Sequence, residues 1–132
     1  MHISRAAHFV AILAGAVMAP TCLTAEDIEA ARPHWEDVTA MADYRSDLYA
    51  AFLNCSDAAA ARILSQGEVT ACNRLYLALK LSYLNGVTLD RYDAMPAKTK
   101  GIAQEKGYAA FRAWRHRQMT MPGDLVAEQK TP

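Results

Sequence analysis

The stretch EVTACNRLYLALKLSYL, residues 68–84, decides the fold of this chain. Its apolar side chains recur every three or four residues, which is the period of an α-helix. They form two apolar faces: Val69, Cys72, Leu75, Tyr76, Leu79 and Tyr83 on one, and Leu77, Leu81 and Leu84 on the other. A helix that is apolar nearly all round is buried on most of its sides. We therefore expect residues 68–84 to form the central helix of the domain, ended by Asn85-Gly86.

The same helical period continues on both sides of this central segment. Thr24 offers a cap for a short helix, Pro33 fits the first turn of a long one, and Ser56 offers a cap for the next. The expected helices are, in chain order, residues 24–31, 33–54, 57–65, 68–84 and 97–118, with a short turn capped by Thr88 over residues 89–94. No stretch alternates between apolar and polar residues as a half-buried strand does. The sequence therefore predicts an all-α fold, a small helical bundle of about four to five helices.

Length and composition limit the chain to one small globular domain. It has 132 residues, of which 52% are apolar and 21% charged, as is ordinary for a folded protein and unlike a disordered one. Fourteen basic residues balance fourteen acidic ones, so the whole chain has no bulk attraction to nucleic acid or to an anionic membrane. We expect no nucleic-acid partner.

The N-terminal residues have the pattern of a secretory signal peptide. Arg5 precedes the apolar run FVAILAGAVM at residues 9–18, and no acidic residue occurs in this part. The run is shorter than the about 20 residues that a transmembrane helix needs, so we expect no membrane span after cleavage. We expect cleavage after Ala25, with a cut after Ala19 as the competing site. The mature chain is predicted to be periplasmic or secreted, and its alanine-rich leader looks bacterial.

The three cysteines also bear on whether the chain is exported and cleaved. Removal of residues 1–25 discards Cys22 and leaves Cys55 and Cys72 as an even pair. Such a pair forms a disulfide in an oxidising compartment, and closing a loop of about 18 residues contributes on the order of 3 kcal/mol. An alternative interpretation keeps Cys22 as the lipidated first residue of an anchored protein. We expect one disulfide, between Cys55 and Cys72.

Beyond the signal peptide, we expect a helical domain over residues 26–118 and a flexible tail over residues 119–132, where helical periodicity is lost. The last helix contains Gly101 and Gly107, each of which weakens it by roughly 1 kcal/mol relative to alanine. We therefore expect close helix packing at both glycines.

Charge is unevenly distributed along the chain. Residues 26–57 hold eight acidic and two basic residues, a net charge of −6, whereas residues 98–117 hold six basic and one acidic residue, a net charge of +5. One interpretation is that two solvated helix faces partly neutralise each other when packed. The other is a dipolar surface that steers a charged partner.

The segment FRAWRHR, residues 111–117, places arginines among aromatic side chains. That pairing binds anionic chains by charge and by stacking, and for an exported protein the anionic chain would belong to the envelope. The candidate binding residues are Tyr108, Arg112, Trp114, Arg115 and Arg117. The alternative is an ordinary exposed helix end, where the helix dipole favours cations without any ligand. We predict a binding or accessory protein whose partner is an envelope protein or an anionic envelope polymer.

A second hypothesis concerns Trp114, His116, Met119 and Met121, which lie within eight residues. Thioether and imidazole ligands suit Cu(I), and an indole face can lie over a bound cation. The ligand set resembles that of periplasmic copper chaperones, which use two methionines, a histidine and a nearby tryptophan. Those proteins are small β-barrels, whereas this chain is predicted to be helical. On a helix, Trp114 and His116 point about 200° apart, so the site requires the chain to unwind after Arg117.

Motifs for enzymatic chemistry are absent from the sequence, including H-E-x-x-H, G-x-S-x-G, the Walker loop and C-x-x-C. Cell-wall hydrolysis by a protonated carboxylate at Glu36 or Glu68 is the remaining enzymatic alternative. Both residues fall in the first turn of an expected helix, where the dipole favours the ionised state, the opposite of what a general acid needs. We therefore expect a protein without catalytic activity and without a cofactor.

Overall fold

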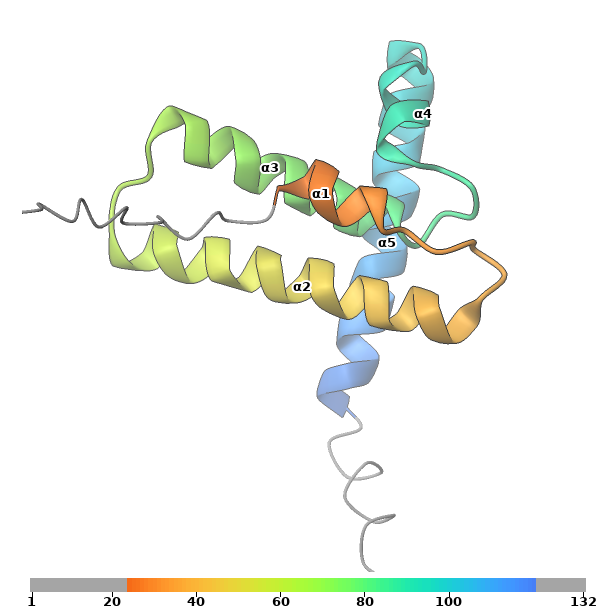
Figure 1. The fold of residues 1–132 in the computed structure, drawn as a ribbon, viewed down its shortest axis with the longest axis horizontal. Helices are drawn as coiled ribbons and strands as arrows, with labels where there is room; N and C mark the ends of the chain where they lie inside the picture. Colours follow the sequence, from red (N-terminus) through yellow and green to blue (C-terminus); the bar gives the residue numbers. More distant parts are fainter. Residues whose placement is uncertain (1–23, 121–132) are drawn as a thin grey trace, which may run out of the picture.

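A computed structural model describes residues 24–120, which form five α-helices and no strand (Figure 1). The helices are α1 (Ala25–Ala30), α2 (Val38–Ala61), α3 (Gln66–Leu81), α4 (Leu89–Asp93) and α5 (Ala97–Thr120). The prediction of an all-α bundle of this size is confirmed for this part of the chain. The predicted signal peptide lies outside the described residues, apart from Thr24 and Ala25, and most of the predicted tail lies outside them as well.

Helix α3 is the centre of the bundle, as its sequence predicts. It packs against each of the other four helices. Helices α2 and α3 run antiparallel as a hairpin, α1 lies along the hairpin, and α5 crosses it steeply (Figure 1). The fully buried side chains of α3 are Leu75, Ala78, Leu79 and Leu81. The position of α3 therefore fixes where every other element lies.

The expected break between residues 54 and 57 is wrong, because α2 continues without interruption to Ala61. The hydroxyl of Ser56 does not cap a new helix; it donates to the Phe52 carbonyl one turn earlier, at 3.2 Å. The alanines that follow have the highest helix propensity and extend the helix. Helix α2 also begins later than expected, after Asp37, whose carboxylate accepts from the Ala40 N–H at 3.0 Å.

Two capping boxes start α1 and α3. The Thr24 hydroxyl accepts from the Asp27 N–H, and the Asp27 carboxylate accepts from the Thr24 N–H at 2.9 Å. Ser65 and Glu68 repeat this arrangement at the start of α3, so α3 begins two residues earlier than expected. Gly67 lies in the first turn of α3, between the two residues of this capping box.

The disulfide is confirmed. Cys55 of α2 and Cys72 of α3 are bonded, and their Cα atoms lie 5.8 Å apart. This bond joins the two helices of the hairpin near the loop that connects them.

The two glycines of α5 differ in what surrounds them. A Cβ atom at Gly107 would lie 2.6 Å from the Lys80 carbonyl oxygen, so α5 crosses α3 in direct backbone contact there. Close packing is confirmed at Gly107. The same prediction is wrong for Gly101, where a Cβ atom would meet nothing within 4 Å.

Candidate functional site

The second half of α5 contributes the centre of an aromatic cluster. Phe111 is 3% exposed. The centroid of its ring lies within 6.4 Å of the centroids of four aromatic rings from α2, from α3 and from the residues just after α3. These rings belong to Tyr49, Phe52, Tyr76 and Tyr83. Trp114 extends the cluster, with its ring 5.1 Å from Tyr49 in an edge-on contact. The tryptophan predicted to bind a partner is therefore half-buried and packs on the core.

Three of the predicted binding residues share one exposed side of α5. Tyr108, Arg112 and Arg115 are separated by four and three residues, so the helical period places them together. The Arg112 guanidinium lies over the Tyr108 ring, 5.6 Å from its centroid. Neither Arg112 nor Arg115 forms an ion pair within residues 24–120. We call these three residues the basic stripe.

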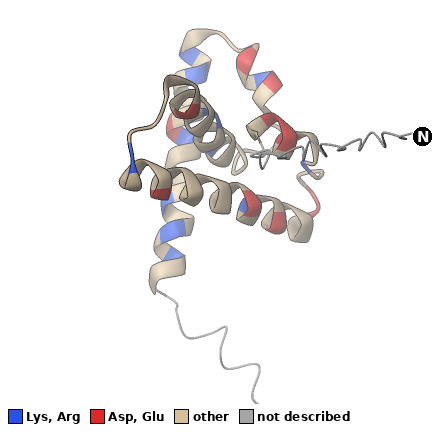
Figure 2. Ribbon diagram, turned by 60° about the vertical axis from the view of Figure 1, so that its left-hand side comes forward, with Lys and Arg blue, Asp and Glu red and all other residues tan. Residues whose placement is uncertain are grey.

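Arg117 does not belong to this stripe. It lies about 140° around the helix from Arg112 and faces the neighbourhood of Tyr83. Burial raises the pKa of the Tyr83 phenol to about 12, and the charges of Arg45 and Arg117 oppose that rise. The structure thus separates the five predicted residues into the stripe, a core tryptophan and an arginine on another side. Figure 2 shows basic residues spread along α5 and acidic residues along α1 and α2.

The residues of the copper hypothesis are not brought together within the described chain. Helix α5 continues to Thr120, so the unwinding that the site requires after Arg117 does not occur up to that residue. His116 and Met119 are exposed one turn apart, while Trp114 packs toward Tyr49. Met121 lies outside the described residues. No group of three or more His, Cys, Asp or Glu side chains within residues 24–120 is arranged to hold a metal ion.

Neither carboxylate of the hydrolase alternative lies in the apolar surroundings that would keep a general acid protonated. Glu36 is exposed in the segment between α1 and α2, with Oε2 3.6 Å from Nδ1 of His34. Glu68 receives hydrogen bonds from Arg62 and from the Ser65 backbone, which lower its pKa from 4.5 to about 2. Glu68 is therefore ionised at neutral pH and acts as a cap of α3.

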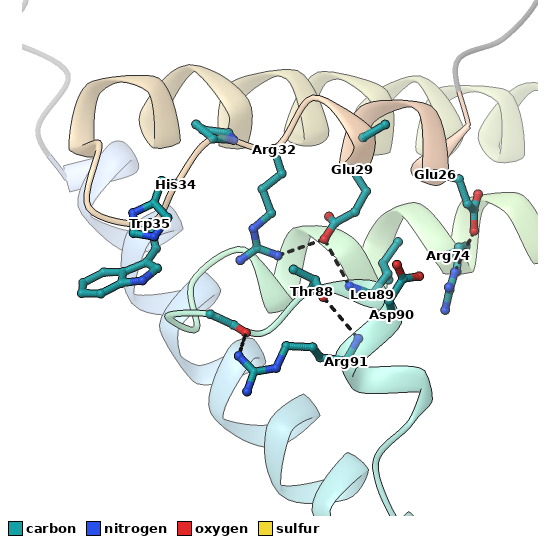
Figure 3. Close-up of a pocket in the computed structure, with 13 residues that line it drawn as sticks. Glu26, Glu29, Arg32, His34, Trp35, Arg74, Thr88, Leu89, Asp90 and Arg91 are labelled. Carbon is teal, nitrogen blue, oxygen red and sulfur yellow. Dashed lines mark hydrogen bonds and ion pairs between the residues drawn. The ribbon is translucent and has the colours of Figure 1, made fainter.

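A pocket of about 720 Å³ with several charged side chains in its lining lies between α1 and the start of α4, and the sequence does not predict it (Figure 3). The Glu29 carboxylate accepts three hydrogen bonds in this pocket. They come from the Arg32 guanidinium at 3.1 Å, from the Leu89 N–H at 3.1 Å and from the Tyr44 hydroxyl. Arg32 also donates to the Val87 carbonyl at 2.7 Å. Burial, followed by the bond to Glu29, raises the pKa of Tyr44 above its usual range.

Most of the other charged side chains around this pocket also have protein partners, with Asp90 as an exception within residues 24–120. Arg74 bonds Glu26 at 2.9 Å and Asp93 at 2.5 Å, and hydrogen bonds from this guanidinium lower the pKa values of both carboxylates. Arg91 donates to the Gly86 carbonyl at 2.6 Å. These bonds tie α1 and α4 to α3. We interpret the pocket as a junction that holds helices together, because most of its charged side chains already bond to other groups of the protein.

Comparison of the chain with family models, curated proteins and solved structures found no match. Among residues 24–120, no helix combines the length and the hydropathy that crossing a membrane requires.

Proposed function

We propose that this chain is a small exported binding protein without catalytic activity, which contacts an anionic macromolecule of the envelope through the basic stripe of α5. The partner is an acidic envelope protein or an anionic envelope polymer. One observation carries the proposal. Arg112 and Arg115 are exposed beside Tyr108 and have no carboxylate partner within residues 24–120, unlike Arg62 and Arg74.

The Tyr108 ring strengthens this interpretation. It is 44% exposed and stacks beneath Arg112, so the stripe offers a flat apolar surface next to two positive charges. Tyrosine and arginine are the side chains that interfaces favour, because each gives contact area together with directed hydrogen bonds.

The leader pattern and the Cys55–Cys72 bond support export, since disulfides persist in oxidising compartments. The two cleavage sites differ in their consequence for α1. A cut after Ala25 removes the Thr24 cap and a side chain that is 2% exposed, whereas a cut after Ala19 retains both. Helix α1 is only six residues long, so losing its cap would loosen it. The mass of the protein purified from its host's envelope distinguishes the two cuts and detects any lipid on Cys22.

The proposal is tested by removing the charges of the stripe. The double variant Arg112→Gln/Arg115→Gln should lose most of its association with isolated host envelopes at low ionic strength, measured by co-sedimentation. The wild-type association should weaken as salt screens the charges. Lys98→Gln/Lys106→Gln is the matched control, because it removes two exposed positive charges of α5 outside the stripe. Equal association of all three proteins would refute the assignment.

A further inference from the structure

A second, wider hollow lies along the α2–α3 hairpin, between α1, α2 and the start of α3. Its volume is about 1000 Å³, at the upper end of the range for ligand pockets. The hollow is lined mainly by apolar groups, which include Ile28, Leu75 and the Cys55–Cys72 disulfide. Four of the nine α2 residues that line it are alanines: Ala40, Ala50, Ala51 and Ala58. We call this hollow the alanine groove.

In the part of the chain that the structure describes, the small side chains along α2 and the shortness of α1 leave the groove open. Helix α1 spans six residues and packs against both α2 and α3, but it is too short to follow the hairpin to its loop. Within residues 24–120, no other helix covers this side of the disulfide. Alanine walls leave room that larger side chains would fill.

The rim of the groove is acidic. Asp27 of α1 and Asp43 and Asp47 of α2 line it, and all three are exposed. None of these carboxylates forms an ion pair within residues 24–120. Asp43 and Asp47 are one helical turn apart, so they present two adjacent negative charges along one edge. Among the described residues, the other charged side chains that line the groove are Arg62 and Glu68, which are paired with each other.

We propose that the alanine groove binds a cationic amphipathic helix of a partner protein. The apolar side chains of that helix, at three- and four-residue spacing, would lie on the groove floor. Its lysines and arginines would meet Asp27, Asp43 and Asp47, which supplies the charge complementarity. An anionic lipid or an acidic peptide would meet three negative charges of its own sign. This site is separate from the basic stripe and selects ligands of opposite charge.

A model peptide tests the proposal on the oxidised, full-length protein. The probe is a fluorescein-labelled helix of about 18 residues, built from leucine at helical spacing and lysine elsewhere. Its binding, followed by fluorescence anisotropy, should weaken about tenfold in Asp43→Asn/Asp47→Asn. The matched control Asp57→Asn/Glu105→Gln removes two exposed carboxylates outside the groove and should bind as the wild type does. Ala58→Trp, which fills the groove without changing charge, should also weaken binding.

Three results would overturn the proposal. The first is equal binding of a leucine–glutamate peptide with the same apolar spacing. The second is peptide binding that appears only after residues 1–23 are removed, which would assign the groove to this chain's own N-terminal segment. The third is a concentration-dependent dimer, seen by sedimentation equilibrium, that is lost in Asp43→Asn/Asp47→Asn, which would assign it to a second copy. Arg112→Gln/Arg115→Gln should keep full peptide binding, so failure of the stripe and failure of the groove are distinguishable.

Discussion

The two ends of the α2–α3 hairpin are held together in opposite ways. At the crossed end, where α5 passes over the hairpin, burial dominates. All the fully buried side chains of α2 lie between Met41 and Leu48, and all those of α3 lie between Leu75 and Leu81. At the disulfide end, residues 55–61 and 66–72, neither helix has a fully buried side chain. There the chain relies on a covalent bond.

This difference shows how a small domain can remain folded while part of its apolar surface is not covered by another helix. Large aromatic side chains fill the crossed end, whereas Ala58 and Ala71 at the disulfide end bury little apolar area and leave the groove open there. A covalent bond holds two helices in register without requiring a third element to cover them. The disulfide end therefore forms one part of the alanine groove, whose acidic rim continues along α2 to Asp43.

The largest effect is expected from the crossed end. Phe111→Ala removes the ring at the centre of the aromatic cluster and should lower the free energy of unfolding by about 3–5 kcal/mol, because a cavity replaces it. Urea denaturation followed by circular dichroism measures this change. Ile63→Ala, at a side chain that is 96% exposed beyond the disulfide end, is the control and should change stability by less than about 0.5 kcal/mol. Similar losses at both positions would contradict the comparison.

Removal of the covalent bond should have the next largest effect. The sequence separation of Cys55 and Cys72 is 17 residues, so Cys55→Ala/Cys72→Ala should destabilise the domain by about 3 kcal/mol. The same denaturation experiment measures it, with the oxidised wild type as reference. A double variant as stable as the wild type would mean that packing alone holds the disulfide end.

The contact between α5 and α3 should be sensitive to a single methyl group. Gly107→Ala forces a Cβ atom against the Lys80 backbone and should cost about 1–3 kcal/mol, even though alanine favours the helix. Gly101→Ala meets open space in the same helix and should stabilise the protein by about 0.5–1 kcal/mol. Thermal unfolding of the two variants should therefore shift in opposite directions, and a shared direction would refute the close crossing.

The smallest effect is expected from the cap of α3 at the disulfide end. The pKa of Glu68 falls from 4.5 in its ordinary state to about 2, chiefly through the hydrogen bond from Arg62. A lowered folded-state pKa means that this group stabilises the fold above about pH 4.5 and that the contribution is lost as pH falls toward 2. Glu68→Gln should therefore flatten the decline in melting temperature over that interval. The control Glu105→Gln, on an exposed residue of α5, should leave the decline unchanged.

Much of the fold follows from local patterns. The apolar faces of residues 68–84 predict the central helix, Thr24 is a recognisable cap, and the even pair of cysteines predicts the disulfide. The continuity of α2 was not predictable from the Ser56 signal, because a serine within a helix can bond the carbonyl one turn earlier instead of capping.

The candidate site was predicted in part. Sequence spacing of four and three residues puts Tyr108, Arg112 and Arg115 on one side of a helix, and the structure has them there. That Trp114 packs on Tyr49 depends on which face α5 turns to the hairpin, which is a tertiary property. The hydrogen bond from the Leu89 N–H to the Glu29 carboxylate joins residues 60 positions apart, and no local sequence pattern specifies such a contact.

Amide hydrogen exchange of the oxidised and the reduced protein tests the central claim most directly, because it reports the stability of each end of the hairpin separately. Reduction of the Cys55–Cys72 bond lowers the free energy of global unfolding, so we expect exchange in Leu75–Leu81 and around Phe111 to accelerate by about a hundredfold. We expect residues 53–72 to accelerate at least about tenfold more than that, because without the bond they also open locally. Equal acceleration at both ends, or none at either, would show that one shared core holds the whole hairpin and would contradict the account.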